Sequence, residues 1–152
     1  MLGMREIYQN GIYHIYSRGT LKMNIFHCPD DYERFLLLMC KYKRKYSVSF
    51  RAFVLMPNHI HLLLVEPEWQ PGQKVAAISR LMHSLLNSHV KYFCKKYRHS
   101  GHVFQSVYRS KLIDSPSYYA QIVKYIHENP VRKGLVSKPE YWPYSSLTRN
   151  LL

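Results

Sequence analysis

The stretch SVSFRAFVLMPNHIHLLLVEP, residues 47–67, constrains the fold of this chain more than any other segment. Its two halves, 47–56 and 59–67, are rich in β-branched, aromatic and other apolar residues, which is typical of buried strands. Pro57 and Asn58 separate the halves, and this pair favours a turn. The segment therefore predicts two strands that pair with each other in a sheet.

Strand and helix patterns alternate along the rest of the chain. Residues 11–20 are aromatic and β-branched and end in a turn signal, and residues 102–114 form a more polar and basic run; both are predicted strands. Residues 28–46 and 75–100 are predicted helices. The first has proline and acids at its start and basic residues at its end, and the second has an apolar stripe.

A last helix is predicted over residues 115–130. Ser115 suits the N-cap, Pro116 suits the first turn, and Pro130 is expected to stop the helix. The aromatic residues of the closing segment EYWPYSSL, 140–147, are expected to pack back on the body of the protein.

The predicted elements follow the order β-α-β-β-α-β-α. This is the split βαββαβ, or ferredoxin-like, sandwich of the α+β class, with an antiparallel sheet and an added C-terminal helix. The length of 152 residues suits one domain over 1–152. The fold alone determines no activity, because RNA-binding modules, small-molecule enzymes and nucleases share it.

The charge of the chain narrows its partners. Lysine and arginine number 22 against 9 acidic residues, which gives a net charge of +13 with neutral histidines. This imbalance favours a polyanion, either nucleic acid or an anionic membrane surface. The 14 tyrosines favour single-stranded nucleic acid, whose bases stack on aromatic rings.

Other features indicate a cytoplasmic protein without a membrane partner. No run approaches the length of about 18 apolar residues that indicates a spanning helix, and the opening residues contain no apolar segment of signal length. The three cysteines are odd in number and form no CxxC motif, which fits a reducing compartment.

His59 and His61 lie two residues apart on a predicted strand, so they project from the same face. Two imidazoles in that arrangement can bind one cation. The alternative is a pair of half-buried structural histidines. Polar residues in so apolar a strand need a reason, but these residues alone leave both interpretations open.

Four segments together resemble the single-tyrosine HUH transposases. RAFVLMPNHIHLLLVEP, 51–67, is similar to their signature of a histidine, a bulky apolar residue and a histidine. VKYIHENPVRKGLV, 123–136, is similar to the tyrosine-helix signature of their REP-associated branch and its insertion-sequence relatives. SGHVFQSVYRSKLI, 100–113, and YWPYSS, 141–146, also match that branch, so the resemblance spans nearly the whole chain in order.

The resemblance implies a metal-dependent enzyme. Members of this family nick single-stranded DNA through a covalent 5′-phosphotyrosine, and the chain is expected to cut and rejoin single-stranded DNA that carries a hairpin. The resemblance also implies a divalent cation, Mg²⁺ or Mn²⁺, held by His59, His61 and a polar residue near the tyrosine, which is Asn129. Some relatives form dimers, so a homodimer is one expectation for the oligomeric state.

The resemblance places the nucleophile at Tyr125. Helical geometry puts Asn129 about 40° around the axis from Tyr125 and one turn along, so both can face one site. Tyr118 lies on nearly the same stripe and remains a rival or a supporting residue. His127 lies about 160° from Tyr125 and is a poor candidate for a ligand. Asn129 has an alternative role as a cap of the helix end.

Basic residues of the long helix, its exit and the last strand are expected to contact DNA phosphates, although such a cluster is often only a solvated face. Tyr92, Tyr97 and Tyr108 lie among them and are expected to stack on bases. The predicted DNA-binding residues are Arg18, Arg80, Lys91, Lys95, Arg98, Tyr108, Arg109 and Lys111. A rival function is a non-catalytic module that binds single-stranded nucleic acid on the same fold.

Overall fold

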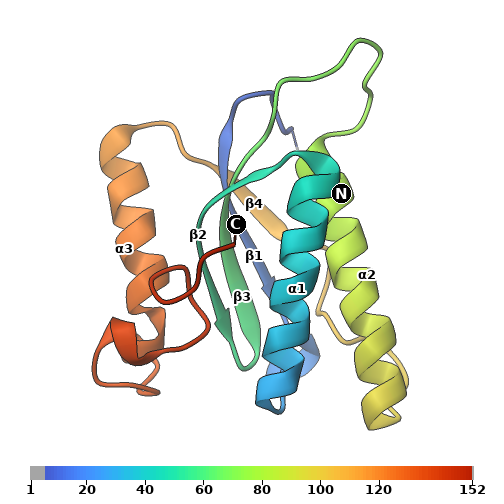
Figure 1. Cartoon of the computed structure of the whole chain (residues 1–152), viewed down its shortest axis with the longest axis vertical. Coiled ribbons are helices and arrows are strands. Elements are labelled where there is room, and N and C mark those ends of the chain that lie inside the picture. Colours follow the sequence, from blue (N-terminus) through green and yellow to red (C-terminus); the bar gives the residue numbers. More distant parts are fainter. Residues whose placement is uncertain (1–5, 152) are drawn as a thin grey trace.

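The computed structural model describes residues 6–151, which form an antiparallel sheet with helices on both faces (Figure 1). Within this part of the chain the four strands lie in the order β2-β3-β1-β4. This confirms the predicted α+β fold with its added C-terminal helix. The elements are β1 (Ile12–Arg18), η1 (Thr20–Lys22), α1 (Pro29–Tyr46), β2 (Ser49–Met56), β3 (His59–Val65), α2 (Ala77–Tyr97), β4 (Arg109–Leu112), α3 (Pro116–Arg132) and η2 (Pro139–Tyr141).

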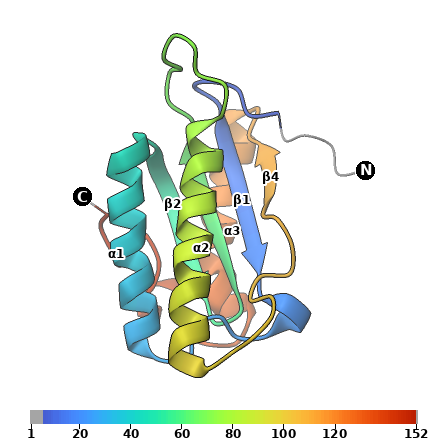
Figure 2. The same ribbon diagram turned by 90° about the vertical axis from the view of Figure 1, so that its right-hand side faces the viewer.

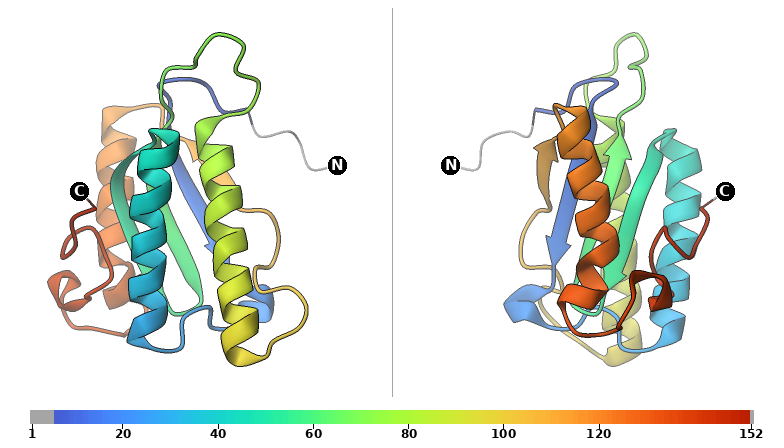
Figure 3. Two further views of the ribbon diagram at one scale, coloured as in Figure 1. Left: turned by 45° about the vertical axis from the view of Figure 1, so that its right-hand side comes forward. Right: turned by 90° about the vertical axis from the view of Figure 1, so that its left-hand side faces the viewer.

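The sheet separates two apolar layers of unequal size. Helices α1 and α2 lie side by side against one face (Figure 2), and α3 lies against the other (Figure 3). Alternation along β3 sends Leu62 into the larger core, while Leu63 packs with Ile126 of α3 in the smaller one. His59 and His61 have the parity of Leu63, so both project toward the face that α3 covers.

The turn at Pro57 and Asn58 joins β2 to β3, as predicted. Met56 pairs with His59 across the turn, and β1 pairs with the other side of β3. Strand β3 is therefore internal to the sheet, and all of its residues except Val65 are buried. Histidines in such a strand need polar partners, and β1 and α3 supply them.

Two predicted boundaries are wrong. The fourth strand is much shorter than 102–114, because the chain before β4 leaves the sheet and buries Val103 and Phe104 in the larger core. Helix α3 continues through Pro130 to Arg132 instead of stopping. A proline this close to the helix end removes one backbone donor only, and Gly134 then turns the chain with a φ of 72°.

The closing segment packs back on the sheet and on α1, as expected. The indole Nε1 of Trp142 donates to the carbonyl oxygen of Leu55 at 2.9 Å. Tyr144 stacks on Tyr32 of α1 with the ring centroids 3.9 Å apart. These contacts cover part of the edge that β2 would otherwise expose.

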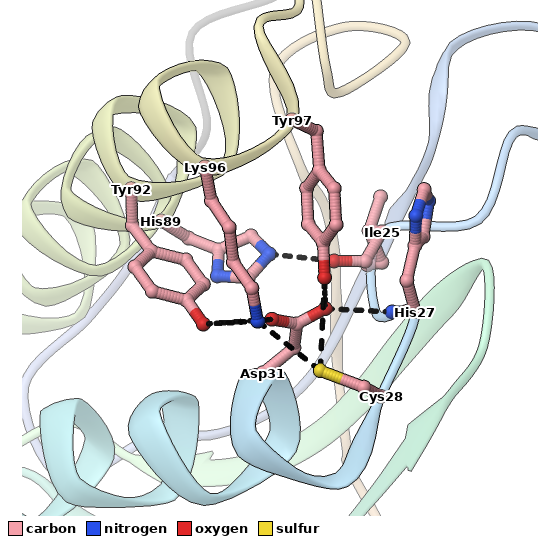
Figure 4. A network of polar contacts seen from close by, with 8 residues as sticks. All are labelled: Ile25, His27, Cys28, Asp31, His89, Tyr92, Lys96 and Tyr97. Carbon is pink, nitrogen blue, oxygen red and sulfur yellow. Dashed lines mark hydrogen bonds and ion pairs between the residues drawn. The ribbon is translucent and has the colours of Figure 1, made fainter.

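A buried carboxylate joins the two helices of the larger layer (Figure 4). Asp31 of α1 is fully buried and accepts hydrogen bonds from the side chains of Tyr92, Lys96 and Tyr97 of α2 and from the backbone N–H of His27. Burial alone would raise the pKa of Asp31, but these donors outweigh it and hold that pKa far below its ordinary value. The network lies on the α1 and α2 side of the sheet, away from the two histidines of β3.

Candidate active site

His59, His61 and Asn129 meet between β3 and the end of α3. The amide Oδ1 of Asn129 lies 3.2 Å from His59 Nε2, and its Nδ2 lies 3.4 Å from His61 Nε2. All three residues are buried. The structure thus brings together the three side chains that the resemblance implies as metal ligands. It does not support a capping role for Asn129, because the helix continues to Arg132 and the Asn129 side chain turns to the histidines.

The proton position on His59 follows from its neighbours. Asn58 Nδ2 donates to the carbonyl oxygen of Lys22 at 3.3 Å, so Asn58 Oδ1 faces His59 Nδ1 at 2.6 Å as an acceptor. His59 therefore carries its proton on Nδ1, and a neutral ring then has a lone pair on Nε2. That lone pair faces the Asn129 amide oxygen.

The imidazoles at this site are neutral at pH 7. Burial is the main cause that lowers the pKa of His59 and of His61, and the neighbouring His14 and His59 lower that of His61 further. Burial, followed by the charge of Lys111, lowers the pKa of His14. Neutral imidazole is the form that binds metal ions.

The donor set fits a divalent cation with nitrogen and oxygen ligands. The His59 Nε2 lone pair and the Asn129 Oδ1 are both acceptors and face each other at 3.2 Å, an arrangement that a cation would stabilise. Within residues 6–151, no group of three or more His, Cys, Asp or Glu side chains is placed to hold a metal ion. A cation held by both histidines would therefore take its third protein ligand from the Asn129 amide oxygen.

Tyr125 lies beside the histidines. It comes from α3 one turn before Asn129, and its ring stands edge-on to His61 with the centroids 5.4 Å apart. The guanidinium of Arg132 lies 5.2 Å from the centre of the Tyr125 ring. A tyrosine ring beside neutral imidazoles and near a guanidinium is suitably placed for a nucleophile.

The alternative tyrosine occupies a different environment. Tyr118 packs in the apolar layer between the sheet and α3, with the ammonium of Lys111 5.2 Å from its ring centre. Among the described residues, Tyr125 lines the cavity at the histidines and Tyr118 does not. His127 points to the tail, where its Nε2 lies 2.7 Å from Ser146 Oγ, as expected for a non-ligand.

An open cavity of about 830 Å³ leads to the histidine pair. It exposes imidazole, phenol and amide groups, and within the described chain none of its lining residues is acidic. Its basic lining residues are Arg18, Lys22, Arg109, Lys111 and Lys133. Part of the positive charge of the chain therefore surrounds one concave site, where it can attract a phosphodiester backbone.

Comparison with known proteins decides the family. The sequence matches the family described as "Transposase IS200 like" over residues 7–129. The chain belongs to the IS200-like transposase family. The match includes β1, the histidine pair, Tyr125 and Asn129.

The relatives of this IS200-like chain include REP-associated proteins. A protein of Haemophilus influenzae, described as a candidate REP-associated tyrosine transposase, is 33% identical over 111 residues, or 70% of this chain and 62% of its own length. The REP-associated tyrosine transposase of Escherichia coli K12 is 24% identical over 124 residues, or 80% of this chain and 67% of its own length. The chain therefore spans about two thirds of each relative.

Solved structures share the fold. The structure of a REP-associated tyrosine transposase bound to a REP hairpin superposes with a TM-score of 0.76 and 22% identity, over 96% of this chain and 82% of that one. A candidate transposase of Deinococcus radiodurans R1 gives a TM-score of 0.52 and 17% identity, over 84% of this chain and 97% of that one.

The predicted DNA-binding residues of this family member divide between the two faces of the sheet. Arg18, Arg109 and Lys111 line the cavity. The other four cations are exposed on α2 or directly after it, in the layer on the far side of the sheet; they are Arg80, Lys91, Lys95 and Arg98. No helix within residues 6–151 has the length and apolar character needed to cross a bilayer.

The tyrosines predicted to stack on bases have structural roles. Tyr108 is only 5% exposed, and its hydroxyl donates to Ser79 Oγ of α2 at 3.2 Å. The hydroxyls of Tyr92 and Tyr97 bind Asp31. These positions do not fit the prediction that the three tyrosines stack on bases. Their hydroxyls are bound to other side chains of the protein, on the side of the sheet opposite the cavity.

The cavity residues that the sequence did not predict include His14, Tyr16, Lys22 and Lys133. His14 and Tyr16 alternate with Arg18 along β1, and Tyr16 pairs with His61 across the sheet. A signal was available, because the first and third strands of this fold are neighbours and alternate residues share a face. The site becomes apparent only when β1 is paired with β3, because the pairing brings the alternate residues of the two strands together on one face.

Proposed function

We propose that this chain cuts and rejoins single-stranded DNA, with Tyr125 as the nucleophile. The observation that supports this most is the meeting of Tyr125 and the His59–His61 pair in one basic cavity, with the Asn129 side chain in contact with both histidines. A binding module would need the cations of the cavity but would not need a buried pair of neutral imidazoles. Membership of the IS200-like transposase family supports the same function.

The reaction is a transesterification. Tyr125 Oη attacks the scissile phosphorus, the bond from phosphorus to the 3′ oxygen breaks, and the leaving strand takes a proton to become a 3′-hydroxyl. The 5′ phosphate stays on the tyrosine. A 3′-hydroxyl that attacks this phosphotyrosine reverses the step and joins strands without a further energy source.

The residues around Tyr125 offset the negative charge of the reacting phosphate. Lys133, Arg109 and Lys111 line the cavity and can neutralise the phosphates on either side of the scissile one. Arg132, over the Tyr125 ring, favours the charge that develops on the phenol oxygen. His59, His61 and Asn129 would hold Mg²⁺ or Mn²⁺, which when bound supplies charge neutralisation and orients the phosphate.

The proposed substrate is single-stranded DNA with a hairpin. The structural relative with a TM-score of 0.76 is described as bound to a REP hairpin. The cavity here is open and bordered by arginine and lysine side chains, so it can admit a strand that continues on both sides of the cut.

The test is a cleavage assay with a 3′-labelled oligonucleotide that contains a hairpin with single-stranded flanks. We expect a labelled band of protein mass on a denaturing gel in Mn²⁺, and none in EDTA. Tyr125→Phe should abolish this band and retain binding to the oligonucleotide, while Tyr118→Phe should keep it. An adduct from Tyr125→Phe would overturn the choice of nucleophile, and binding by the wild type with neither cleavage nor adduct would favour the non-catalytic module.

A further inference from the structure

His14 lies beside His61 and is in none of the four segments that carry the resemblance. Its Nε2 is 2.9 Å from His61 Nδ1, and the two rings lie nearly parallel, with centroids 5.0 Å apart and planes 17° apart. We propose that His14 is a positioning residue that holds His61 in the orientation and tautomer needed for metal binding. This inference rests on the proposed function.

The contact decides which nitrogen of His61 is available to a metal. A neutral imidazole has one N–H, and its position is set by the hydrogen bond of the other nitrogen. When His61 Nδ1–H donates to His14 Nε2, the lone pair of His61 lies on Nε2, which faces Asn129 at 3.4 Å. The opposite tautomer would direct an N–H toward Asn129 and leave no ligand there.

The same arrangement occurs at the other histidine of the pair. His59 Nδ1 is bound by Asn58 Oδ1 at 2.6 Å, and its Nε2 also faces Asn129. Each histidine therefore has Nδ1 occupied by a neighbouring side chain and Nε2 directed to the same amide. Such outer partners orient metal-binding histidines and increase their basicity.

The sheet fixes His14 in this place. Strand β1 lies between β3 and β4, so His14 is opposite Leu63 on one side and Lys111 on the other. Its ring also meets the Tyr125 ring edge-on, with centroids 6.4 Å apart. His14 thus contacts both a candidate ligand, His61, and the candidate nucleophile, Tyr125. The contacts of Asn129 are with His59 and His61 instead.

Two substitutions separate the hydrogen bond from the packing. His14→Phe keeps a flat ring beside His61 and removes the acceptor, and His14→Gln keeps a side-chain acceptor in a smaller shape. His83→Phe is the matched control, because His83 is an exposed histidine of α2 whose polar contact is with Asn87. Thermal unfolding of each variant shows whether it is folded.

Two measurements are made on these proteins, and neither depends on cleavage. ¹⁵N chemical shifts of labelled histidines in metal-free protein report the His61 tautomer. Electron paramagnetic resonance titration with Mn²⁺ alone reports affinity. We expect His61 to be the Nδ1–H tautomer in the wild type and to lose that preference in His14→Phe, with Mn²⁺ binding about 10- to 100-fold weaker. His14→Gln should restore part of both, and His83→Phe should change neither.

The outcomes separate this inference from the metal site itself. An Nε2–H tautomer of His61 in the wild type, or wild-type Mn²⁺ affinity and tautomer in folded His14→Phe, would overturn the role of His14 while the metal site stands. Absence of Mn²⁺ binding by the wild type would overturn the metal site, and with it the proposed purpose of the contact.

Discussion

At the scale of single residues, the site depends on where a few protons and lone pairs lie. His59 and His61 are buried and neutral, and each directs Nε2 at Asn129. Burying two imidazoles and an amide costs free energy that apolar side chains of the same size would not cost. The proposed cation at their meeting point would account for a strand that keeps them.

His59→Ala and His61→Ala should each remove a ligand of the proposed metal site. We expect Mn²⁺ affinity to fall at least about 100-fold, with cleavage abolished in parallel and only weakly rescued by excess Mn²⁺. Titration calorimetry with Mn²⁺ measures the first effect, and His83→Ala on α2 is the control. Wild-type cleavage by either variant, or by the wild type in EDTA, would contradict the metal proposal.

Asn129 allows a finer test, because its amide oxygen can be kept or removed. Asn129→Ala should weaken Mn²⁺ binding and slow cleavage, whereas Asn129→Asp retains an oxygen and adds a charge, so it should keep or tighten Mn²⁺ binding and keep some activity. The measurement is cleavage rate against Mn²⁺ concentration. A wild-type metal curve for Asn129→Ala, with only a shifted melting temperature, would leave Asn129 a structural residue.

At the scale of secondary structure elements, the Asp31 network fixes α1 against α2. It adds one buried carboxylate, with three side-chain donors from α2, to the apolar core that the two helices share. Breaking such a buried pair leaves charged and polar groups without partners, whereas exposed ion pairs contribute little.

Asp31→Asn should therefore destabilise the protein by about 3 kcal/mol, because the buried asparagine amide nitrogen cannot accept the hydrogen bonds that a carboxylate oxygen accepts from these donors. Glu33→Gln is the matched control on the same helix: Glu33 pairs with Arg149 at a partly exposed position, and its loss should cost less than about 1 kcal/mol. Urea unfolding of the two variants measures both. Equal losses of unfolding free energy would mean that the Asp31 network contributes no more than a surface pair.

The sequence predicts the elements better than the site they build. Local patterns identify the hairpin at Pro57 and Asn58, and the resemblance predicts Tyr125 and Asn129, which the structure places beside the two histidines. Strand pairing is not local, so the contact of His14 with His61 could not be seen. The sequence ends α3 too early, because a proline in a last turn costs little. Sequence clustering also does not show which face of the sheet a helix covers, so it groups the cations on and directly after α2 with those of the cavity.

At the scale of the whole molecule, the net charge of +13 is spread over two faces. The cavity face holds Arg109 and Lys111, and the opposite layer holds Lys91 and Lys95. All four side chains are exposed, so replacing them disturbs little packing. Their separation allows the DNA-binding face to be identified.

Arg109→Ala with Lys111→Ala should weaken binding of a single-stranded oligonucleotide and reduce its salt dependence. The slope of log affinity against log salt should become shallower by roughly 0.7 for each DNA phosphate that the variant no longer neutralises. Lys91→Ala with Lys95→Ala should have a much smaller effect. Fluorescence anisotropy at several salt concentrations measures both pairs. The reverse order would assign the DNA to the face of α2.

The buried histidines also predict how stability depends on pH. Burial lowers the pKa of His14, His59, His61 and His89 below the ordinary 6.5, that of His89 to about 4. As pH falls through 6.5, the unfolded chain takes up protons that the folded chain does not, so the unfolding free energy decreases, by up to roughly 1.4 kcal/mol per pH unit for each such proton. Asp31 adds a second loss only below its ordinary value of 3.8.

Urea unfolding at pH 7.5, 6.5 and 5.5 in EDTA measures this dependence. We expect a loss of unfolding free energy between each pair of values, and the loss between pH 6.5 and 5.5 should be roughly three times that between pH 7.5 and 6.5. A constant free energy over this range would mean that these imidazoles take up protons in the folded protein as they do in the unfolded chain, against the burial that keeps them neutral.

The central claim, that Tyr125 forms the covalent bond to DNA, is tested most directly by locating the bond. Trypsin cuts after Lys111, Lys124 and Arg132, so Tyr118 and Tyr125 fall on different peptides, 112–124 and 125–132. After reaction with a hairpin-containing single strand and nuclease digestion, mass spectrometry should find a nucleotide linked through its 5′ phosphate to peptide 125–132. A nucleotide on peptide 112–124, or on neither peptide despite cleavage of the strand, would contradict the account.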